Sequence, residues 1–174
     1  MSAQPDSIVL KRDRDLAGRR HEIWIRRAGI VLLTAVVILA LVNIFGQRPS
    51  TSTAATDAAK LKVYAPARVR SGLLYEARFR ITARRELRQA TLVLDPGWLE
   101  GMSVNTIEPS PTSESSRDGR LSLDLGHIPA GKSFLLFMQF QVLPTNVGHR
   151  SQDVALLDGE RKLLEIHRTI TIFP

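Results

Sequence analysis

The stretch EARFRITAR, residues 76–84, alternates apolar and polar side chains at every position. Successive side chains of a β-strand point to opposite faces of its sheet, so this period of two is typical of a half-buried strand. The apolar positions are Ala77, Phe79 and Ile81, continued by Ala83. The stretch therefore predicts a strand with one side in a core and one side in solvent.

Similar short runs fill residues 60–174, and turn signals separate them. They are LKVYA, ATLVL, MSVNTI, RLSLDL, SFLLFMQFQVLP, VALLDGERKLLEI and TITIFP. The run SFLLFMQFQVLP is the most apolar, which predicts a central strand covered on both faces. About seven or eight strands result, without a convincing helix between them. This pattern predicts an all-β, Ig-like antiparallel β-sandwich over residues 60–174.

Turn chemistry adds detail to this prediction. DPGW, residues 95–98, predicts a type II turn, in which proline presets φ and glycine accepts a positive φ. Asp158-Gly159 lies between two apolar runs and predicts a β-hairpin. Gly126 and Gly131 bracket a further turn, where we expect positive φ values.

A second kind of segment precedes these strands. Residues 28–46, AGIVLLTAVVILALVNIFG, hold no charge, and as a helix they would be roughly 28 Å long, close to the ~30 Å hydrocarbon core of a bilayer. A cleaved signal has a shorter apolar region of about 7–15 residues. Cleavage near Ala54 and a buried soluble helix are the alternatives, and the length favours a retained transmembrane helix.

The residues that flank the apolar segment predict its orientation. Those before it include Lys11, Arg12, Arg14, Arg19, Arg20, Arg26 and Arg27. The thirteen residues after it hold only Arg48, so the positive-inside rule predicts a cytoplasmic basic tail over residues 1–27 and an extracytoplasmic C-terminal domain. We favour this topology role over a nucleic-acid or anionic-lipid patch, because acidic residues interrupt the basic ones.

Two further features follow from the same flanks. Trp24, Arg26 and Arg27 are expected to lie at the membrane interface, where an indole ring is half buried and its N–H is hydrated. Residues 47–59 are small and polar, without a hydrophobic period, and predict a flexible linker between the membrane and the sandwich.

The strand and turn motifs resemble the immunoglobulin-like repeat modules of bacterial surface and secreted proteins over about residues 60–145. In those modules a strand enters a Leu-Pro-Gly type turn, and a Leu-x-Leu-Gly step later leads into a long apolar strand. That step is matched by Leu123, Leu125, Gly126, Ile128, Pro129, Ala130, Gly131 and Ser133. The chain differs in having one copy on an N-terminal anchor and in Trp98. The resemblance implies a sandwich with adhesion, spacing or assembly roles.

Composition restricts the chemistry. The chain has 174 residues and no cysteine, which excludes disulfides, thiolate metal sites and a cysteine nucleophile. Its four histidines are scattered, and no Gly-x-Ser-x-Gly elbow, phosphate-binding glycine loop or zinc spacing is present. The sequence therefore predicts no catalytic residues, no metal, no cofactor and no nucleic-acid partner.

Two surfaces are candidates for binding. The first is an arginine face made of Arg78, Arg80, Arg84, Arg85 and Arg88. It would suit acidic lipid headgroups, anionic wall polymer or an acidic partner, and the alternative is a solvated face with cross-strand partners such as Glu76. The second is a long polar loop over residues 108–119, with the candidates Glu108, Ser110, Glu114, Arg117 and Asp118. Such loops tend to be functional or disordered.

Together these features predict a single-pass cell-membrane protein that is not an enzyme. Its extracytoplasmic sandwich would bind or organise components of the cell envelope, with another envelope protein as the partner. One alternative is a small accessory subunit that joins a membrane complex through its transmembrane helix. An envelope enzyme is the least favoured alternative, because no site for one is evident. The sequence does not specify an oligomeric state.

Overall fold

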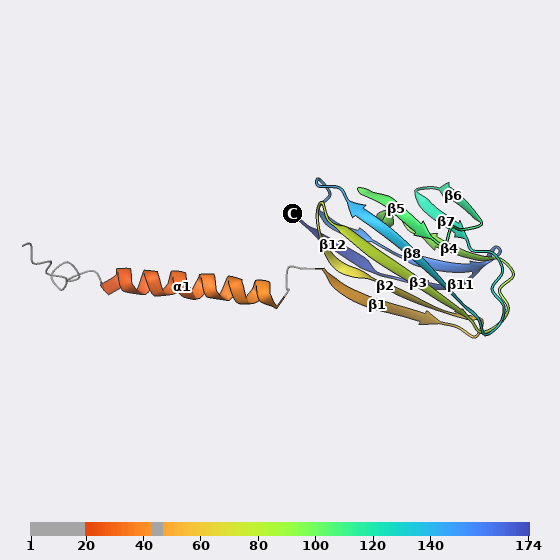
Figure 1. Cartoon of the computed structure of the whole chain (residues 1–174), viewed down its shortest axis with the longest axis horizontal. Helices are drawn as coiled ribbons and strands as arrows, with labels where there is room; N and C mark the ends of the chain where they lie inside the picture. The colour runs from red at the N-terminus through yellow and green to blue at the C-terminus, as the bar shows by residue number, and fades with distance from the viewer. Residues whose placement is uncertain (1–19, 43–46) are drawn as a thin grey trace, which may run out of the picture. The chain divides into compact units, whose positions relative to one another are not determined.

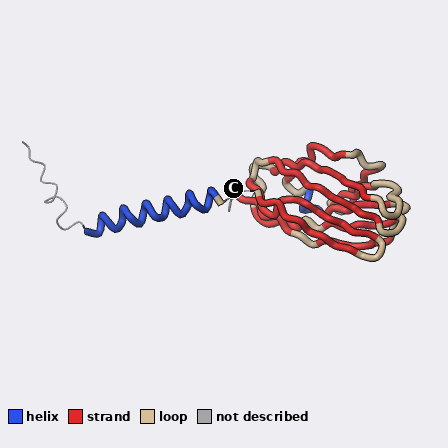
Figure 2. Tube along the Cα trace, turned by 60° about the horizontal axis from the view of Figure 1, so that its bottom comes forward, coloured by secondary structure: helices blue, strands red, loops and turns tan. Residues whose placement is uncertain are grey.

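The computed structural model describes residues 20–42 and 47–174 and divides the chain into two units, Met1–Ile44 and Phe45–Pro174. Most of the predicted basic tail and the last residues of the predicted membrane span lie outside the described residues. Among its described residues, the first unit contains one helix. The second is built from strands, drawn in red in Figure 2, with one short helical turn among its described residues.

The helix α1 comprises Arg20–Leu41, so it begins eight residues before the predicted span. Arginine has a high helix propensity, and the charges of Arg26 and Arg27 therefore do not end the helix. Within it, Ile23–Leu41 is long and apolar enough to cross a membrane, by length and composition. The Arg27 guanidinium lies 5.9 Å from the centre of the exposed Trp24 ring.

The second unit is an all-β sandwich of two sheets (Figure 1). More strands occur among the described residues than the seven or eight predicted. They are β1 (Arg48–Ala55), β2 (Ala59–Arg70), β3 (Leu74–Ala83), β4 (Ala90–Leu94), β5 (Met102–Glu108), β6 (Ser113–Arg117), β7 (Arg120–Asp124), β8 (Ser133–Val142), β9 (Gly148–Ser151), β10 (Val154–Asp158), β11 (Arg161–Ile166) and β12 (Thr169–Phe173).

The larger sheet has the order β5-β8-β3-β2-β12-β9, and the smaller sheet has the order β11-β10-β4-β7-β6. Strand β2 has two neighbours on the side away from β3. Strand β1 pairs antiparallel with residues 60–68 of β2, and β12 pairs parallel with residues 68–70. The other strand pairs are antiparallel. The all-β sandwich predicted from the sequence is therefore confirmed.

The core lies between the two sheets and centres on Trp98, whose side chain is 0% exposed. The Trp98 ring lies 5.3 Å from the Phe79 ring and 5.4 Å from the Phe140 ring, measured between centroids. Both rings come from the larger sheet, one from β3 and one from β8. Alternation in β3 is as predicted, because Ala77, Phe79, Ile81 and Ala83 are all buried.

The predicted type II turn at residues 95–98 is wrong. Pro96–Trp98 forms a short 3₁₀ helix, η1, and Gly97 does not have a positive φ. Glycine is needed here for space, because a Cβ atom at Gly97 would lie 1.8 Å from the backbone oxygen of Ser151. This close approach places Trp98 in the core, where its Nε1 donates a hydrogen bond to the Asp153 carbonyl at 3.2 Å.

The other turn predictions are confirmed. Gly126 and Gly131 have φ values of 72° and 76°. Strands β10 and β11 form the predicted hairpin, with Asp158 opposite Arg161 and Gly159 at a φ of 58°. The glycines thus predicted these turns correctly, because a positive φ is adopted readily by glycine and rarely by other residues.

The flexible linker predicted over residues 47–59 is also wrong, because β1 occupies most of it. Ser and Thr residues fill this edge strand, and its backbone pairs with β2 without any need for an apolar period. The Ser50 hydroxyl adds a hydrogen bond to the Ala65 carbonyl at 3.0 Å. An edge strand with polar side chains also resists pairing with other chains.

Strand β8 is central in its sheet, between β5 and β3, as predicted. It is not covered on both faces, however. Leu136 and Met138 are buried against the core, whereas Gln139 is exposed, and Leu135 and Phe137 lie half-buried on the outer face. The additional apolar residues of this strand therefore belong to the outer surface of the larger sheet.

Candidate functional site on the outer face of the larger sheet

Three neighbouring strands bring a group of large side chains together on the outer face of the larger sheet. In one row across the strands, Lys62 of β2 lies opposite Arg80 of β3, and Arg80 lies opposite Leu135 of β8. The adjacent row contains Tyr64, Arg78 and Phe137 in the same order. We call these six residues the cationic face.

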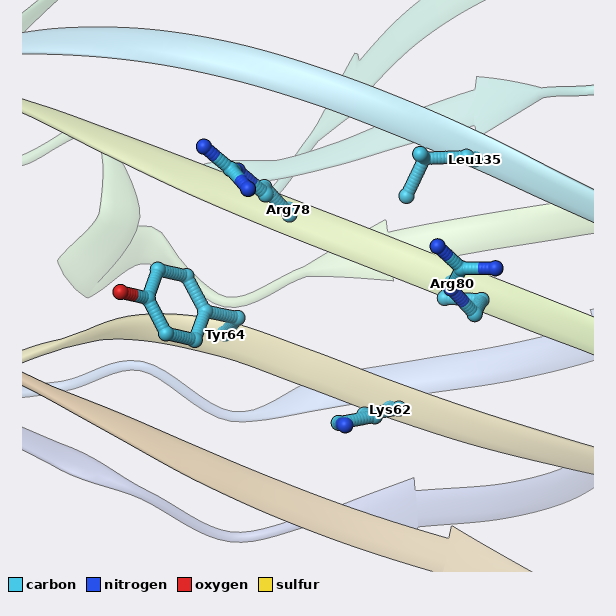
Figure 3. Close-up of a pocket in the computed structure, with 5 residues that line it drawn as sticks. All are labelled: Lys62, Tyr64, Arg78, Arg80 and Leu135. Carbon is cyan, nitrogen blue, oxygen red and sulfur yellow. The ribbon is translucent and has the colours of Figure 1, made fainter.

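A shallow depression of about 180 Å³ lies within the cationic face. It is lined by Lys62, Tyr64, Arg78, Arg80 and Leu135, whose side chains project from β2, β3 and β8 (Figure 3). Three of these five side chains are cationic and none is acidic. The depression is therefore suited to a small anionic group.

Arg78 is held in place from several sides. Its guanidinium carbon lies 5.5 Å from the Tyr64 ring centre and 5.6 Å from the Phe137 ring centre. Glu76, two positions earlier on the same strand, accepts hydrogen bonds from it. The hydrogen bond and charge of Glu76 raise the pKa of Arg78 above its ordinary value. This guanidinium is thus positioned before any ligand arrives.

Lys62 and Arg80 differ from Arg78, because neither is paired with an acidic side chain among the described residues. They are direct cross-strand neighbours with the same charge, an arrangement that is destabilising in a sheet. Within residues 20–42 and 47–174, neither side chain forms a hydrogen bond or an ion pair. The face therefore retains uncompensated positive charge at its centre.

The five arginines predicted to form one face are divided by the structure. Arg78 and Arg80 lie on the cationic face. Arg84 is exposed beyond the end of β3, and its Nη1 donates a hydrogen bond to the Thr56 carbonyl at 2.9 Å. Arg85 lines a separate depression of about 360 Å³, and Arg88 is exposed in the segment before β4.

Sequence reasoning missed the other four residues of the cationic face. Lys62 and Tyr64 alternate with buried residues in LKVYA, so their exposure was readable from the sequence. Their position beside Arg78 and Arg80 was not readable, because the register between β2 and β3 is set by tertiary pairing.

The second predicted surface, the loop over residues 108–119, is mostly not a loop. Glu114 and Arg117 belong to β6, which pairs with β7, and Asp118 is in the two-residue turn that joins them. Glu108 ends β5, and Ser110 is exposed between β5 and β6. Asp118-Gly119, with φ values of 53° and 75°, was a readable hairpin signal that the sequence analysis did not use.

Another arginine, Arg168, lies in the core and is only 8% exposed. Its guanidinium carbon is 5.6 Å from the Trp98 ring centre, and its Nη2 donates hydrogen bonds to the carbonyls of Ala65 and Pro66 at 3.0 and 3.3 Å. Burial lowers the pKa of Arg168. This side chain joins η1 to β2 and is out of reach of a ligand.

Two of the four histidines contact carboxylates. His127 contacts Glu86. His167 Nδ1 lies 2.8 Å from Asp153 Oδ2, and its Nε2 lies 3.8 Å from Glu165 Oε2. Among the described residues, no three His, Asp or Glu side chains gather in a way that could hold a metal ion. The cationic face is accordingly the strongest candidate site among the described residues.

No protein-family model matches the chain, and no curated protein matches it. Among solved structures, the chain is similar to the solution structure of CaCohA2 from Clostridium acetobutylicum. The two are 11% identical, with a TM-score of 0.43, over 75% of this chain and 94% of that chain. This likeness concerns the fold, so the site is interpreted from its own residues.

Proposed function

We propose that this chain is a single-pass membrane protein whose extracytoplasmic sandwich is a binding or assembly module, without enzymatic activity, for another component of the cell envelope. The length and composition of Ile23–Leu41 support the anchor. The excess of basic residues before this segment supports a cytoplasmic N-terminus.

The observation that carries the binding role is the cationic face. The cross-strand pair Lys62 and Arg80 is destabilising for the isolated protein, and such local conflicts tend to occur at functional sites. Leu135 and Phe137 add half-buried apolar surface beside it. Because β2, β3 and β8 are each paired on both sides, a ligand here would be bound by side chains rather than by strand addition.

The topology is tested first, and the absence of cysteine makes the test simple. Single cysteines are introduced by Ser7→Cys in the tail and by Ser115→Cys on the exposed strand β6. Intact cells are then treated with a membrane-impermeant maleimide. We expect labelling at position 115 without lysis and at position 7 only after lysis. The reverse pattern would overturn the proposed topology.

The binding role is tested with a photo-crosslinking amino acid at Leu135, which lines the depression, and at Ser115 as a control on the other sheet. Crosslinks at position 135 are compared between the wild-type background and the Lys62→Gln/Arg80→Gln background. We expect a defined adduct that is lost in the double variant and absent at position 115. An adduct that persists in the double variant would rule out the cationic face.

A further inference from the structure

The pattern of charge on the outer face indicates which kind of ligand it fits. The uncompensated cations Lys62 and Arg80 lie in one row. Two carboxylates lie on the same face: Glu76 is on β3, the strand of Arg80, and Glu108 is on β5, two strands from β3. A membrane surface or a polyanion that covers the face would meet repulsion from Glu108, which forms no ion pair among the described residues, whereas Arg78 compensates the charge of Glu76. A partner whose negative charge is localised avoids this repulsion, because its charged group can bind at the depression without approaching the carboxylates.

The apolar part of the face adds a second requirement. Leu135 and Phe137 are two positions apart on β8 and lie half-buried on the outer side, where strand positions are usually polar. Leu135 is the direct neighbour of Arg80, and Phe137 is the direct neighbour of Arg78. A ligand that covers both rows therefore needs apolar atoms next to its negative charge.

The spacing of the face matches an extended chain. Side chains two positions apart on one side of a strand are separated by about 6.7 Å, so Arg78 and Arg80, like Leu135 and Phe137, repeat at this interval. An extended peptide presents its alternate side chains with the same repeat. Arginine also binds carboxylates through two parallel N–H donors.

Building on the proposed binding role, we infer that the ligand is an acidic, extended segment of a partner protein. A carboxylate of this segment enters the depression between Lys62 and Arg80, and a neighbouring apolar side chain packs on Leu135 and Phe137. Arg78 is already ordered by Glu76, Tyr64 and Phe137, so little side-chain entropy is lost at that position when the segment binds.

The test uses the full-length chain in nanodiscs of neutral lipid and a random peptide display library as the probe. Peptides are selected on the wild type after depletion on the Lys62→Gln/Arg80→Gln variant. We expect enriched peptides to carry Asp or Glu close to an apolar residue. Their affinity should fall about tenfold or more in the double variant, which corresponds to about 1.4 kcal/mol or more. Changing the peptide carboxylate to an amide should have a similar effect.

The matched control is Lys132→Gln/Arg161→Gln, which removes the same charge from exposed positions away from the depression. Peptide affinity should be unchanged in this variant. Equal losses in both double variants would show a non-specific effect of net charge and overturn the inference. Failure to select any peptide that depends on Lys62 and Arg80 would overturn it as well.

A short-chain, soluble phosphatidylglycerol tests the lipid alternative on the same nanodiscs. If it binds with the same dependence on Lys62 and Arg80 while no acidic peptide is enriched, the ligand is a lipid headgroup and the inference is wrong. Concentration-dependent dimerisation that is lost in the Lys62→Gln/Arg80→Gln variant would instead identify a second copy of this chain as the occupant, and would likewise overturn it.

One substitution separates loss of binding from loss of folding. Lys62→Glu places opposite charges across β2 and β3, so we expect the urea midpoint of unfolding to rise while peptide binding is lost. A fall in the midpoint would contradict the repulsion between Lys62 and Arg80 on which the inference depends. The peptide assay does not depend on membrane orientation, so it can fail or succeed independently of the topology experiment.

Discussion

Arg78 and Arg168 both lie against aromatic rings of the sandwich, and they differ in almost everything else. Arg168 covers Trp98 in the core, donates to two backbone carbonyls and has a pKa lowered by burial. Arg78 lies between Tyr64 and Phe137 at the surface, and Glu76 raises its pKa. A guanidinium packed on an aromatic ring therefore stabilises the core at Arg168, whereas at Arg78 it forms an ordered part of the exposed surface.

The difference lies in what each guanidinium can still bind. Arg168 is only 8% exposed, so a ligand cannot reach it, although its Nε and Nη1 have no hydrogen-bond partner in the described part of the chain. Its removal should therefore lower the stability of the fold. Around the ordered Arg78, the neighbouring cations Lys62 and Arg80 remain without partners among the described residues. Substitutions there should weaken binding and leave the fold intact. A structural role for Arg168 and a binding role for the cationic face thus predict different effects of substitution.

The largest effect is expected at the ring beneath the buried arginine. Trp98→Ala removes a fully buried indole that contacts Phe79 and Phe140, which should lower the free energy of unfolding by about 3–5 kcal/mol. The surface substitution Tyr64→Ala removes an exposed cation–π contact with Arg78 and should lower it by only about 0.5–1 kcal/mol. Urea unfolding of the full-length chain in detergent, followed by circular dichroism, measures both. Similar losses of unfolding free energy in the two variants would contradict this difference between the core and the cationic face.

The next effect concerns the arginines themselves. Arg168→Ala removes the buried Nη2 donor from the carbonyls of Ala65 and Pro66, and the Ala65 carbonyl keeps its hydrogen bond from the Ser50 hydroxyl. The Pro66 carbonyl loses this buried donor, and one unsatisfied group contributes about 1–3 kcal/mol of destabilisation. Arg78→Ala should leave the unfolding midpoint nearly unchanged and weaken binding at the cationic face. If Arg168→Ala unfolds at the wild-type midpoint, the buried arginine is not a structural contact.

A smaller effect, of opposite sign, is expected at the centre of the cationic face. Lys62→Glu should raise the free energy of unfolding by about 0.2–1 kcal/mol, because opposite charges replace like charges across two strands. Thr53, on the neighbouring strand β1, lies opposite Lys62. Thr53→Glu should therefore also reduce the repulsion between Lys62 and Arg80, because it gives Lys62 an acidic neighbour. Both gains should shrink at high salt, and gains that persist there would point to a cause other than charge.

The smallest effect depends on pH and concerns the segment that carries Arg168. Asp153 accepts hydrogen bonds from His167 and from the Arg168 backbone N–H. The hydrogen bond to Asp153, aided by its charge, raises the pKa of His167. The contact therefore contributes its full stabilisation of the folded state below the unfolded histidine pKa of about 6.5. This contribution is lost as the pH rises through the pKa of His167 in the folded protein.

His167→Gln tests this contribution. The difference in urea midpoint between wild type and variant should be largest below about pH 6 and should fall as the medium becomes alkaline. On the carboxylate side, burial acts to raise the pKa of Asp153, but the bonds and charge of its neighbours outweigh burial and lower it. The Asp153 contribution is thus present above the ordinary carboxyl pKa and is lost as pH falls through the folded value. A difference independent of pH would show that His167 contributes only through packing.

Much of the fold could be predicted from the sequence because local rules decide it. The strict alternation in β3 and the positive φ values of Gly126 and Gly131 are properties of single segments. Strand β1 was missed for a corresponding reason: at the edge of a sheet it needs only backbone partners, and a Ser- and Thr-rich strand has no apolar period.

The candidate site could be predicted only in part. The exposure of Arg78 and Arg80 followed from the alternation of one strand. Their neighbours Lys62, Leu135 and Phe137 come from two other strands, and only the register places them together. Arg168 was not singled out because nothing local distinguishes a buried arginine from a solvated one. Its partners, Trp98 and the carbonyls of β2, are distant in sequence.

Strand β12 lies between β2 and β9 in the larger sheet, although it follows all the other described strands in the sequence. Until residues 169–173 take their place, β9 has no neighbour in the order of this sheet, and the end of β2 beyond β1 is open. This part of the sheet therefore forms only after residues 169–173 have been synthesised. A chain cut short after residue 168 would keep an unfinished sheet, with open strand edges available to any nearby chain.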